Sequence, residues 1–589
     1  MVGCGDDGSS VECGAGTTLM GDSCVPAGTP VTCGSGTELM NGECLPTGSP
    51  VLCGEGTILV SGECVPDDGE EPLLTFALAE EESGYAELVA DIEAMDAADA
   101  DNHLDQAALA MWATMGTSLE QLEFLFDHGD ELTEINFTEL DGAGSLTMPD
   151  GSPLASRFTR VPTGGRFTGP NATSCLSCHS GPIGNSGGPN VANVMQDPEP
   201  AVPGLFNARQ TISIQGGGLI QILAEDMTTD LLALKDQALA NPNTEVELKS
   251  NDVSFGSITC DDAGECNYEN LAGVSPDLIV RPMGWKGNFP TLRGFSADAA
   301  FGEMGMQPDE VLWLITEPGN TETPSVDGDG DGVARELSVG DVTALTLYLA
   351  LQEMPTTVIE LADAGLAELS DEDRAMITAG EARFSSLGCD GCHVSEYTIS
   401  TTLFEEPSTR VGGLFEAQDL TARNVGYSAA SPLVVDLSST LADEPRAVKE
   451  SDGSSVIRPY TDLKRHFMGN HLADDAKAYF PKSASQIDVT ELPDDADASS
   501  LANVDPQIGL GEFLTPELWG VGNTGPWLHD GRAVTLREAI LLHGEETPTT
   551  PASEAQAARD AFASLNKAQQ DEVLAFLLNL VLVDMSDEE

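Results

Sequence analysis

The sequence predicts a mainly α-helical protein with two large domains, preceded by a small region of β-hairpin repeats. Three observations lead to this fold class. The first 68 residues repeat a cysteine pattern, a Cys-x-x-Cys-His motif occurs twice, and apolar residues recur at helical spacing in much of the remainder. At 589 residues, the chain is also too long for one ordinary domain.

The repeat region, residues 1–68, contains three copies of the form C-G-x-G-T-x-L-x-x-x-x-C-[VL]-P. In each copy, "GTxL" predicts a short strand, and the Gly, Asn and Asp residues that follow predict a turn. So short a unit cannot bury a core, and we expect a disulfide to hold it. The expected pairs are Cys13–Cys24, Cys33–Cys44 and Cys53–Cys64. Zinc is the weaker alternative because no histidine lies nearby. Disulfides indicate an oxidising compartment: the periplasm, the cell surface or the outside of the cell.

The rest of the chain divides by composition into three segments. Residues 69–117 read as an acidic helical linker, residues 118–370 as a first domain and residues 371–589 as a second. The second domain begins with a helix N-cap pattern, in which Ser370 is followed three residues later by Asp373. It ends with an amphipathic helix in "LNKAQQDEVLAFLLNLVL". Cys260 and Cys266 flank an acidic, turn-like loop in the first domain.

The charge balance excludes some classes of partner. The formal net charge is −73, from 98 acidic and 25 basic residues. Nucleic acid and anionic membrane surfaces both require the opposite sign. The excess charge fits either solubility in a salty environment or the attraction of a basic partner. No apolar run reaches the roughly 18 residues that a membrane helix needs.

The two Cys-x-x-Cys-His motifs are "SCLSCH" and "GCDGCH". This pattern is the attachment site of haem c, in which two thiols bind the porphyrin vinyl groups and the histidine binds the iron. The expected attachment residues are Cys175, Cys178 and His179 for the first haem, and Cys389, Cys392 and His393 for the second. A thioredoxin-like dithiol or half of a zinc site is the alternative for a single match. Two matches favour two covalent haems, each in a cytochrome-c-like domain, with the two domains facing each other.

The stretch "VIRPYTDLKRHFMGNHLADD" offers a distal ligand for the second haem. Met468 is the first choice, because a methionine opposite a histidine raises the haem potential and makes the haem an electron store. His466 is the second choice, and a plain core role is the alternative for Met468. His471 is also present in this stretch.

The stretch "VRPMGWKGNFPTLRGFSADAAFGEMGMQPDE" contains candidates for the first haem. Trp285 lies in a turn flanked by Gly and Lys, which indicates a functional position. Glu303 is a candidate distal acid that would move a proton from the inner to the outer oxygen of peroxide. The alternative for Glu303 is a solvated surface acid. Met304 or Met306 could instead bind the iron.

An acidic stretch, "DGDGDGVARE", has the first oxygens of an EF-hand-like calcium loop. The candidate ligands are Asp327, Asp329, Asp331 and Glu336. The twelfth position is Ser338 rather than glutamate, and Glu336 lies two residues before it. An acidic turn without calcium is the alternative.

From about residue 118 to residue 585, these motifs resemble the di-haem oxidoreductase family, related to the bacterial di-haem cytochrome c peroxidases. The resemblance also includes "ELTEINFTELDGAG", "PYTDLKRHFMG" and "LTPELWGVGNTGPWLHDGRAVTLREAILLHGEE". It implies one electron-storing haem and one peroxidatic haem. It also implies a tryptophan between the haems at Trp285, a distal glutamate at Glu303, a methionine ligand at Met468, and an element near the second haem with His529, Asp530 and Arg532. No histidine follows shortly after His179, where the peroxidases have a displaceable ligand, and Met195 is the nearest ligand-type residue there.

Together these observations predict a periplasmic or cell-surface enzyme that reduces peroxide with electrons from a small cytochrome or cupredoxin. An oxidase or oxygenase of an organic or protein substrate is a second hypothesis, and a surface electron-transfer cytochrome is a third. The opening "MVGC" resembles the end of a lipobox, so Cys4 is a candidate lipid anchor; an ordinary unpaired cysteine is the alternative. The repeats are predicted to be a stalk or a binding module.

Overall fold

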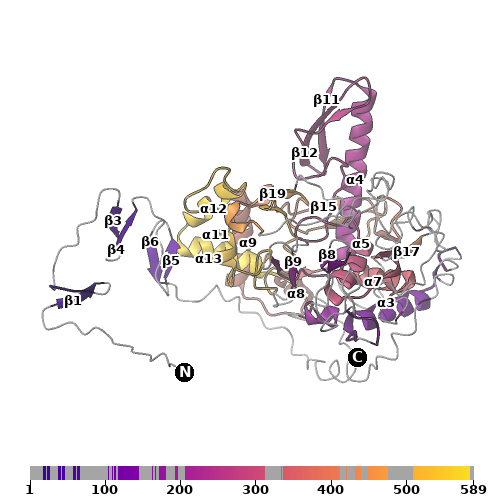
Figure 1. Ribbon diagram of the computed structural model, residues 1–589, viewed down its shortest axis with the longest axis horizontal. Helices are drawn as coiled ribbons and strands as arrows, with labels where there is room; N and C mark the ends of the chain where they lie inside the picture. The colour runs from indigo at the N-terminus through magenta and orange to yellow at the C-terminus, as the bar shows by residue number, and fades with distance from the viewer. Residues whose placement is uncertain are drawn as a thin grey trace, which may run out of the picture. The chain divides into compact units, whose positions relative to one another are not determined.

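A computed structural model gives the architecture of the chain (Figure 1). It describes the strands within residues 17–66, residues 104, 109, 112–114, 117–138, 140–144, 162–163, 166–167, 172–180, 193–196, 206–311, 333, 336–411, 420, 432–438, 447–474 and 508–583. The chain divides into two compact units, Met1–Asp68 and Gly69–Glu589.

The first unit contains three β-hairpins, one in each sequence repeat. Their strands are β1 (Thr17–Met20), β2 (Ser23–Pro26), β3 (Thr37–Met40), β4 (Glu43–Pro46), β5 (Thr57–Val60) and β6 (Glu63–Pro66). Each pair is antiparallel, with Leu19, Leu39 and Leu59 opposite the second cysteine of the repeat. The strand predicted for "GTxL" is therefore confirmed in all three copies. The disulfide pairs predicted here, and Cys4, lie outside the described residues.

Two helices form the centre of the C-terminal part of the second unit. Helix α9 (Asp371–Ser386) packs against α13 (Lys567–Leu578), and α11 (Leu536–Leu541) and α12 (Gln556–Ala563) lie beside them (Figure 1). The Ser370 side chain accepts a hydrogen bond from Asp373 N, so the predicted N-cap is confirmed. A buried cluster joins these helices, with Phe384, Phe562 and Phe576 at its centre.

A second group of helices holds the N-terminal part of this unit together. Its helices are α3 (Leu119–Glu134), α4 (Gly217–Ala240), α5 (Leu292–Ala299), α7 (Val339–Leu351) and α8 (Val358–Ala364). Helix α3 lies on α7 closely enough that a Cβ on Gly129 would clash with the backbone of Ala344. Apolar residues of α4, from Leu219 to Leu231, lie in a large buried cluster that also contains Ala344 and Leu347 of α7.

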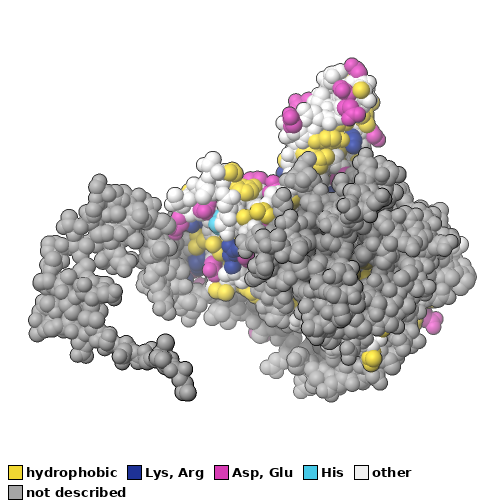
Figure 2. All heavy atoms as spheres, viewed as in Figure 1, with side chains coloured by type: hydrophobic (Ala, Val, Ile, Leu, Met, Phe, Trp, Pro, Cys, Tyr) yellow, Lys and Arg dark blue, Asp and Glu magenta, His cyan; other side chains and the backbone are white. Residues whose placement is uncertain are grey.

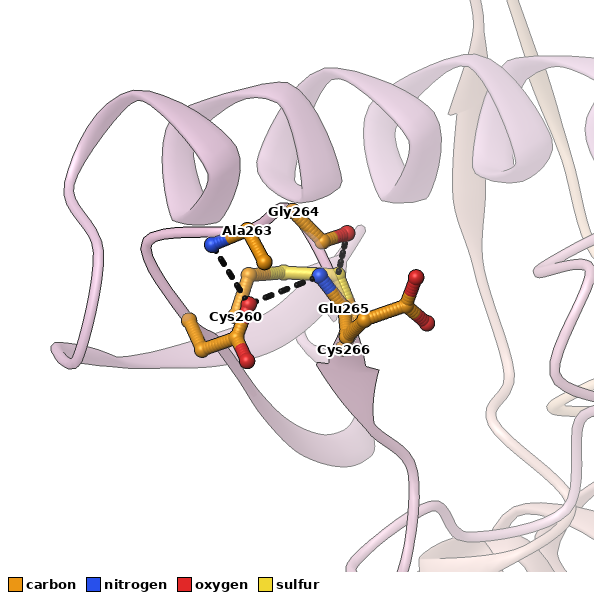
Figure 3. The surroundings of a disulfide bond; sticks show 6 residues. Cys260, Ala263, Gly264, Glu265 and Cys266 are labelled. Carbon is orange, nitrogen blue, oxygen red and sulfur yellow. Dashed lines mark hydrogen bonds between the residues drawn. A yellow bond between two sulfur atoms is a disulfide. The ribbon is translucent and has the colours of Figure 1, made fainter.

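Helix α4 continues into an arm that projects from the body in Figure 1. The arm's sheet is formed by β11 (Glu245–Ser250), β12 (Val253–Cys260) and β13 (Cys266–Asn267), in that order. A disulfide between Cys260 and Cys266 closes its tip, and the Asp261 carboxylate accepts hydrogen bonds from Ala263 N and Glu265 N (Figure 3). Acidic side chains gather at this tip in Figure 2.

Short strands connect the remaining segments in antiparallel pairs. They are β7 (Pro162–Thr163) with β8 (Arg166–Phe167), β9 (Asn193–Gln196) with β10 (Phe206–Arg209), β14 (Thr356–Thr357) with β21 (Leu580–Val581), β15 (Tyr397–Ile399) with β18 (Ser455–Ile457), β16 (Leu403–Glu406) with β17 (Leu433–Asp436), and β19 (Arg465–Phe467) with β20 (Glu512–Leu514). The prediction of a mainly helical body is therefore confirmed in part, because the structure also contains these strand pairs and the arm's sheet. Two-residue strands are too short for alternation to reveal them. Among the described helices, none has the length and apolar character of a membrane span.

Candidate functional site

The second Cys-x-x-Cys-His motif forms a tight turn immediately after α9. Its first residues form a 3₁₀ turn, Cys389–Gly391, and His393 N donates to Cys389 O at 3.0 Å. This turn places both cysteines and the histidine on adjacent positions of one helical surface. His393 Nδ1 lies 2.9 Å from the Tyr460 carbonyl oxygen. Because a carbonyl can only accept, Nδ1 donates and Nε2 retains the lone pair that can bind a metal.

A mostly apolar cavity of about 380 Å³ opens beside this motif. Its lining includes Cys389, Cys392, His393, Met468, Trp285, Phe384, Phe513, Trp519, Trp527, His529 and His543. Two thiols, an imidazole and apolar walls in one cavity are the donor set and environment that a covalently attached haem requires. Burial lowers the pKa of His393 to about 4, which keeps the ring in the neutral, metal-binding form. The residues present therefore fit a haem.

The two residues predicted as iron ligands opposite His393 differ in their hydrogen bonds. Both Met468 and His466 line it. His466 Nε2 lies 2.8 Å from Asp462 Oδ2, and Nδ1 lies 2.7 Å from Glu554 Oε2. Burial lowers the pKa of His466, but the hydrogen bonds with Asp462, Cys392 and Glu554 outweigh burial and raise it to about 12. Both ring nitrogens thus donate to carboxylates and have no lone pair to offer.

His466 also belongs to a group of side chains that tests whether the second motif could be part of a zinc site. Donor atoms of Cys392, Asp462 and His466 lie within 4.8 Å of one another, but the second cysteine of the motif, Cys389, is not in this group. Burial raises the pKa of Cys389 to about 12, whereas thioredoxin-like dithiols have lowered thiol pKa values. Cys389 and Cys392 are also not joined to each other. The geometry therefore favours neither alternative reading of the motif.

Aromatic residues form part of the cavity wall. Trp285 Nε1 donates to the Gln210 carbonyl oxygen at 2.8 Å, and the Trp285 and His529 rings meet edge to face at 6.5 Å. His529 stacks on Phe513 with centroids 4.1 Å apart. Of the element predicted to lie near the second haem, His529 lines the cavity, while Asp530 and Arg532 pair with each other beside it.

His543 is a cavity residue that sequence reasoning did not assign. Its Nδ1 lies 2.7 Å from the Ala539 carbonyl oxygen, so Nε2 carries the lone pair. Burial lowers the pKa of His543, and the ring is neutral. In the sequence, only the position of His543 in the "LLHGEE" stretch could have marked it as a site residue. Helical spacing does not show that α11 ends at the cavity.

The first Cys-x-x-Cys-His motif repeats this local geometry. A 3₁₀ turn, Cys175–Ser177, begins at the Ser174 cap, and His179 N donates to Cys175 O at 3.0 Å. Ala172 N donates to the Glu303 carbonyl oxygen, which joins the motif segment to the stretch that contains Glu303. Burial, with the nearby Glu303 carboxylate, raises the pKa of Cys178 to about 11. Glu303 therefore lies beside the first motif.

Glu303 belongs to an irregular helical segment. Residues Ala300–Met304 form a π-helical turn after α5, a geometry that is frequent at functional sites. The neighbouring candidates Met304 and Met306 are buried in an apolar cluster with Leu132 and Leu345, as core methionines are. Helix α5 spans about 12 Å and separates Trp285, at the second cavity, from Glu303, at the first motif.

Part of the predicted site lies beyond the described residues. Asp327, Asp329 and Asp331, three of the four predicted calcium ligands, are outside them, and so is the side chain of Met195. Glu336 is buried, and its Oε2 accepts a hydrogen bond from Gln307 N at 2.6 Å. The calcium site stays a prediction.

One comparison with known proteins agrees with the family resemblance in the C-terminal part of the chain. Residues 493–580 match the family model described as "Di-haem oxidoreductase, putative peroxidase", which confirms the resemblance for this part of the chain. The matched range contains much of the cavity wall, including Phe513, His529 and His543. The crystal structure of a MauG-like protein associated with microbial copper homeostasis matches with 15% identity and a TM-score of 0.25, covering 62% of this chain and 89% of that one. No curated protein matches the sequence.

Proposed function

We propose that this chain, whose C-terminal part matches the di-haem oxidoreductases, reduces hydrogen peroxide with electrons from an external donor. The observation that carries the proposal is the cavity in which Cys389, Cys392, His393 and Met468 converge. A second motif of the same local geometry, beside an acidic side chain, supplies the other half. We propose one cytochrome-c-like haem domain around each motif, with the two domains facing each other.

The second site would store one electron. Cys389 and Cys392 would hold a haem through thioethers, and the Nε2 atom of His393 would bind its iron. Met468 would take the opposite position, because His466 is held by two carboxylates. The hydrogen bond from His393 Nδ1 to Tyr460 O orients the ring and makes it a stronger ligand.

The first site would bind peroxide. Cys175, Cys178 and His179 would hold the first haem, whose iron would supply an electron when bound. Glu303 would take the proton from the inner oxygen of peroxide and deliver it to the outer oxygen, which then leaves as water. The hydrogen bond from Ala172 N to the Glu303 carbonyl oxygen, which joins this residue to the motif segment, supports that role.

Trp285 would be the relay between the two sites. Its ring lines the second cavity, and its indole N–H is fixed by Gln210. The stretch from Trp285 to Glu303 runs from one site to the other through α5, which supports a position between the haems.

Further assignments stay proposals. The disulfide between Cys260 and Cys266 supports a periplasmic or cell-surface location, because such bonds persist in oxidising compartments. The acidic charge would favour a basic electron donor, such as a small cytochrome or cupredoxin. We also propose a calcium ion at the acidic loop, a lipid anchor at Cys4, and a stalk or binding role for the hairpin repeats.

The deciding experiment is electron paramagnetic resonance of the oxidised, haem-containing protein, repeated after one-electron reduction. We expect a high-spin ferric signal from one haem, at rest or on half-reduction, because one site must be open to peroxide. Low-spin signals alone, from both haems at rest and from the remaining ferric haem after half-reduction, would instead mean an electron carrier. An open haem without peroxide turnover, in the presence of a donor, would favour an oxidase or oxygenase of another substrate.

A further inference from the structure

Arg559 is the only lysine or arginine among the described residues that line the cavity beside the second motif. It lies on α12, and its side chain is 9% exposed. Ala555, Ala557 and Ala558 line the cavity from the same segment, so the wall near Arg559 is formed by short side chains. A single charged group in a mostly apolar cavity is the kind of polar contact that fixes the orientation of a ligand.

The guanidinium of Arg559 uses only two of its three nitrogens in contacts with the protein. Nε donates to the Leu541 carbonyl oxygen at 3.0 Å, and Nη1 donates to Asp560 Oδ1 at 3.1 Å. Nη2 has no hydrogen-bond partner in the part of the chain that the structure describes. The Asp560 side chain is 54% exposed and also accepts from Gln556 Nε2, so its pairing with the guanidinium is weakened by water. A largely buried cation is therefore left with an exposed counter-ion only.

The other titratable groups of the lining do not compete for the same role. Both ring nitrogens of His466 donate to carboxylates, those of Asp462 and Glu554. Burial lowers the pKa of His529 to about 4, so this ring is neutral. Glu517 also lines the cavity, but burial raises the pKa of its carboxyl group, which makes it a weak counter-ion for the guanidinium. The cavity thus has one cation that an incoming anion can pair with.

We propose that the Arg559 guanidinium binds a propionate of the haem attached at Cys389 and Cys392. The inference rests on the proposed function, because it requires a haem in this cavity, but it does not depend on which residue binds the iron opposite His393. A haem carries two propionate carboxylates, at the porphyrin edge opposite the vinyl groups. A guanidinium presents its N–H donors in the planar fork that a carboxylate accepts. The pair would give the buried cation a buried counter-ion.

The same pair would support electron storage at this site. Reduction adds an electron to the haem, and an unpaired propionate close by would oppose this step by charge repulsion. The Arg559 guanidinium would cancel that charge and so raise the reduction potential of the second haem. Arg559 is therefore a residue that orients and tunes the cofactor, and it has no part in the reaction of peroxide.

The test compares the haem-containing wild type with Arg559→Met, which keeps much of the side-chain length and removes the charge. We expect the reduction potential of the second haem to fall and the propionate bending band of the resonance Raman spectrum to shift. Arg374→Met is the matched control and should leave both unchanged, because that arginine on α9 is 36% exposed and pairs with Asp363. A wild-type propionate band in Arg559→Met overturns the inference even if the potential falls, since the guanidinium then pairs with another carboxylate.

A second variant covers the case in which Arg559→Met fails to fold or to retain haem. Arg559→Lys keeps the charge but replaces the planar fork by one ammonium group. We expect it to retain haem, with a potential near that of wild type and a shifted propionate band, and an unchanged band overturns the inference.

Mass spectrometry of wild type separates this inference from the proposed function. If the peptide with Cys389 and Cys392 carries no haem, the proposed function itself fails. If that peptide carries haem and the propionate band does not respond to either change at Arg559, only the role of Arg559 is wrong.

Discussion

Arg293 is fully buried and contacts two carboxylates, those of Glu310 and Glu406. Its guanidinium also donates to Thr343 Oγ1 and to the Val339 carbonyl oxygen. One buried cation therefore joins α5, α7 and β16. Two acids share this single cation, and burial raises the pKa of Glu406 to about 7 although Arg293 opposes the shift.

The raised pKa of Glu406 makes stability depend on pH. Its ordinary pKa is 4.5, so the folded state binds more protons than the unfolded state between about pH 4.5 and 7. The contribution of Glu406 is fully present below about pH 4.5 and is lost as pH rises through 7. In wild type, this loss should lower the free energy of unfolding by about 3 kcal/mol between pH 4.5 and pH 7. We expect Glu406→Gln to lack this pH-dependent decrease, as measured by urea denaturation at several pH values between these limits. Glu396→Gln, at an exposed position, is the control. An unchanged pH profile in Glu406→Gln would contradict the prediction.

Glu303 permits a direct test of proton transfer. We expect Glu303→Gln to reduce peroxide turnover by about 100-fold or more, because the amide cannot carry the proton between oxygens. The visible spectra of both haems should stay as in wild type. Turnover is measured with an excess of a small chemical electron donor, so that donor docking does not limit the rate. A variant with wild-type turnover would make Glu303 an ordinary acid.

At the scale of elements, the contact between α9 and α13 places the second motif. Gly380 in α9 faces α13 so closely that an added Cβ would lie 1.8 Å from the Glu572 carbonyl oxygen and 2.9 Å from the Phe576 Cβ. Phe576 in turn packs on Phe384, one helical turn before the motif. The glycine therefore permits the helix spacing on which the position of Cys389 depends.

We expect Gly380→Ala to destabilise the protein by about 2 kcal/mol or more, because backbone must move to admit the methyl group. The loss of unfolding free energy is measured by denaturant titration, with haem content of the second site measured on the same samples. Gly302→Ala is the control, since a Cβ at that position meets nothing within 4 Å. Equal stability of the two variants would show that the α9–α13 contact can relax without cost.

At the scale of the whole molecule, charge acts on both stability and association. With a net charge of −73, mutual repulsion between acidic residues opposes the compact state. We expect the thermal unfolding midpoint to rise with added sodium chloride, because salt screens this repulsion. Scanning calorimetry at several salt concentrations measures the effect. A midpoint that stays constant or falls would mean that local ion pairs, such as Arg410–Asp226, outweigh the overall repulsion.

Local patterns by themselves determined several features of this protein. The strand in each hairpin repeat, the Ser370 cap and the terminal helix follow from neighbouring residues, and the structure contains them. The turn at each Cys-x-x-Cys-His motif is equally local. These features depend on side chains and backbone groups a few positions apart, so spacing in the chain is enough to predict them.

Only the tertiary structure decided which side chains meet in the second cavity. Asp462 and Glu554, 92 positions apart in the sequence, occupy both nitrogens of His466. Lys286 reaches carbonyl groups more than two hundred positions away. Such contacts are set by how α9, α13 and the short strand pairs pack, and no periodicity records that packing. The sequence thus determined which chemical groups are present, and the fold determined which of them are free to act.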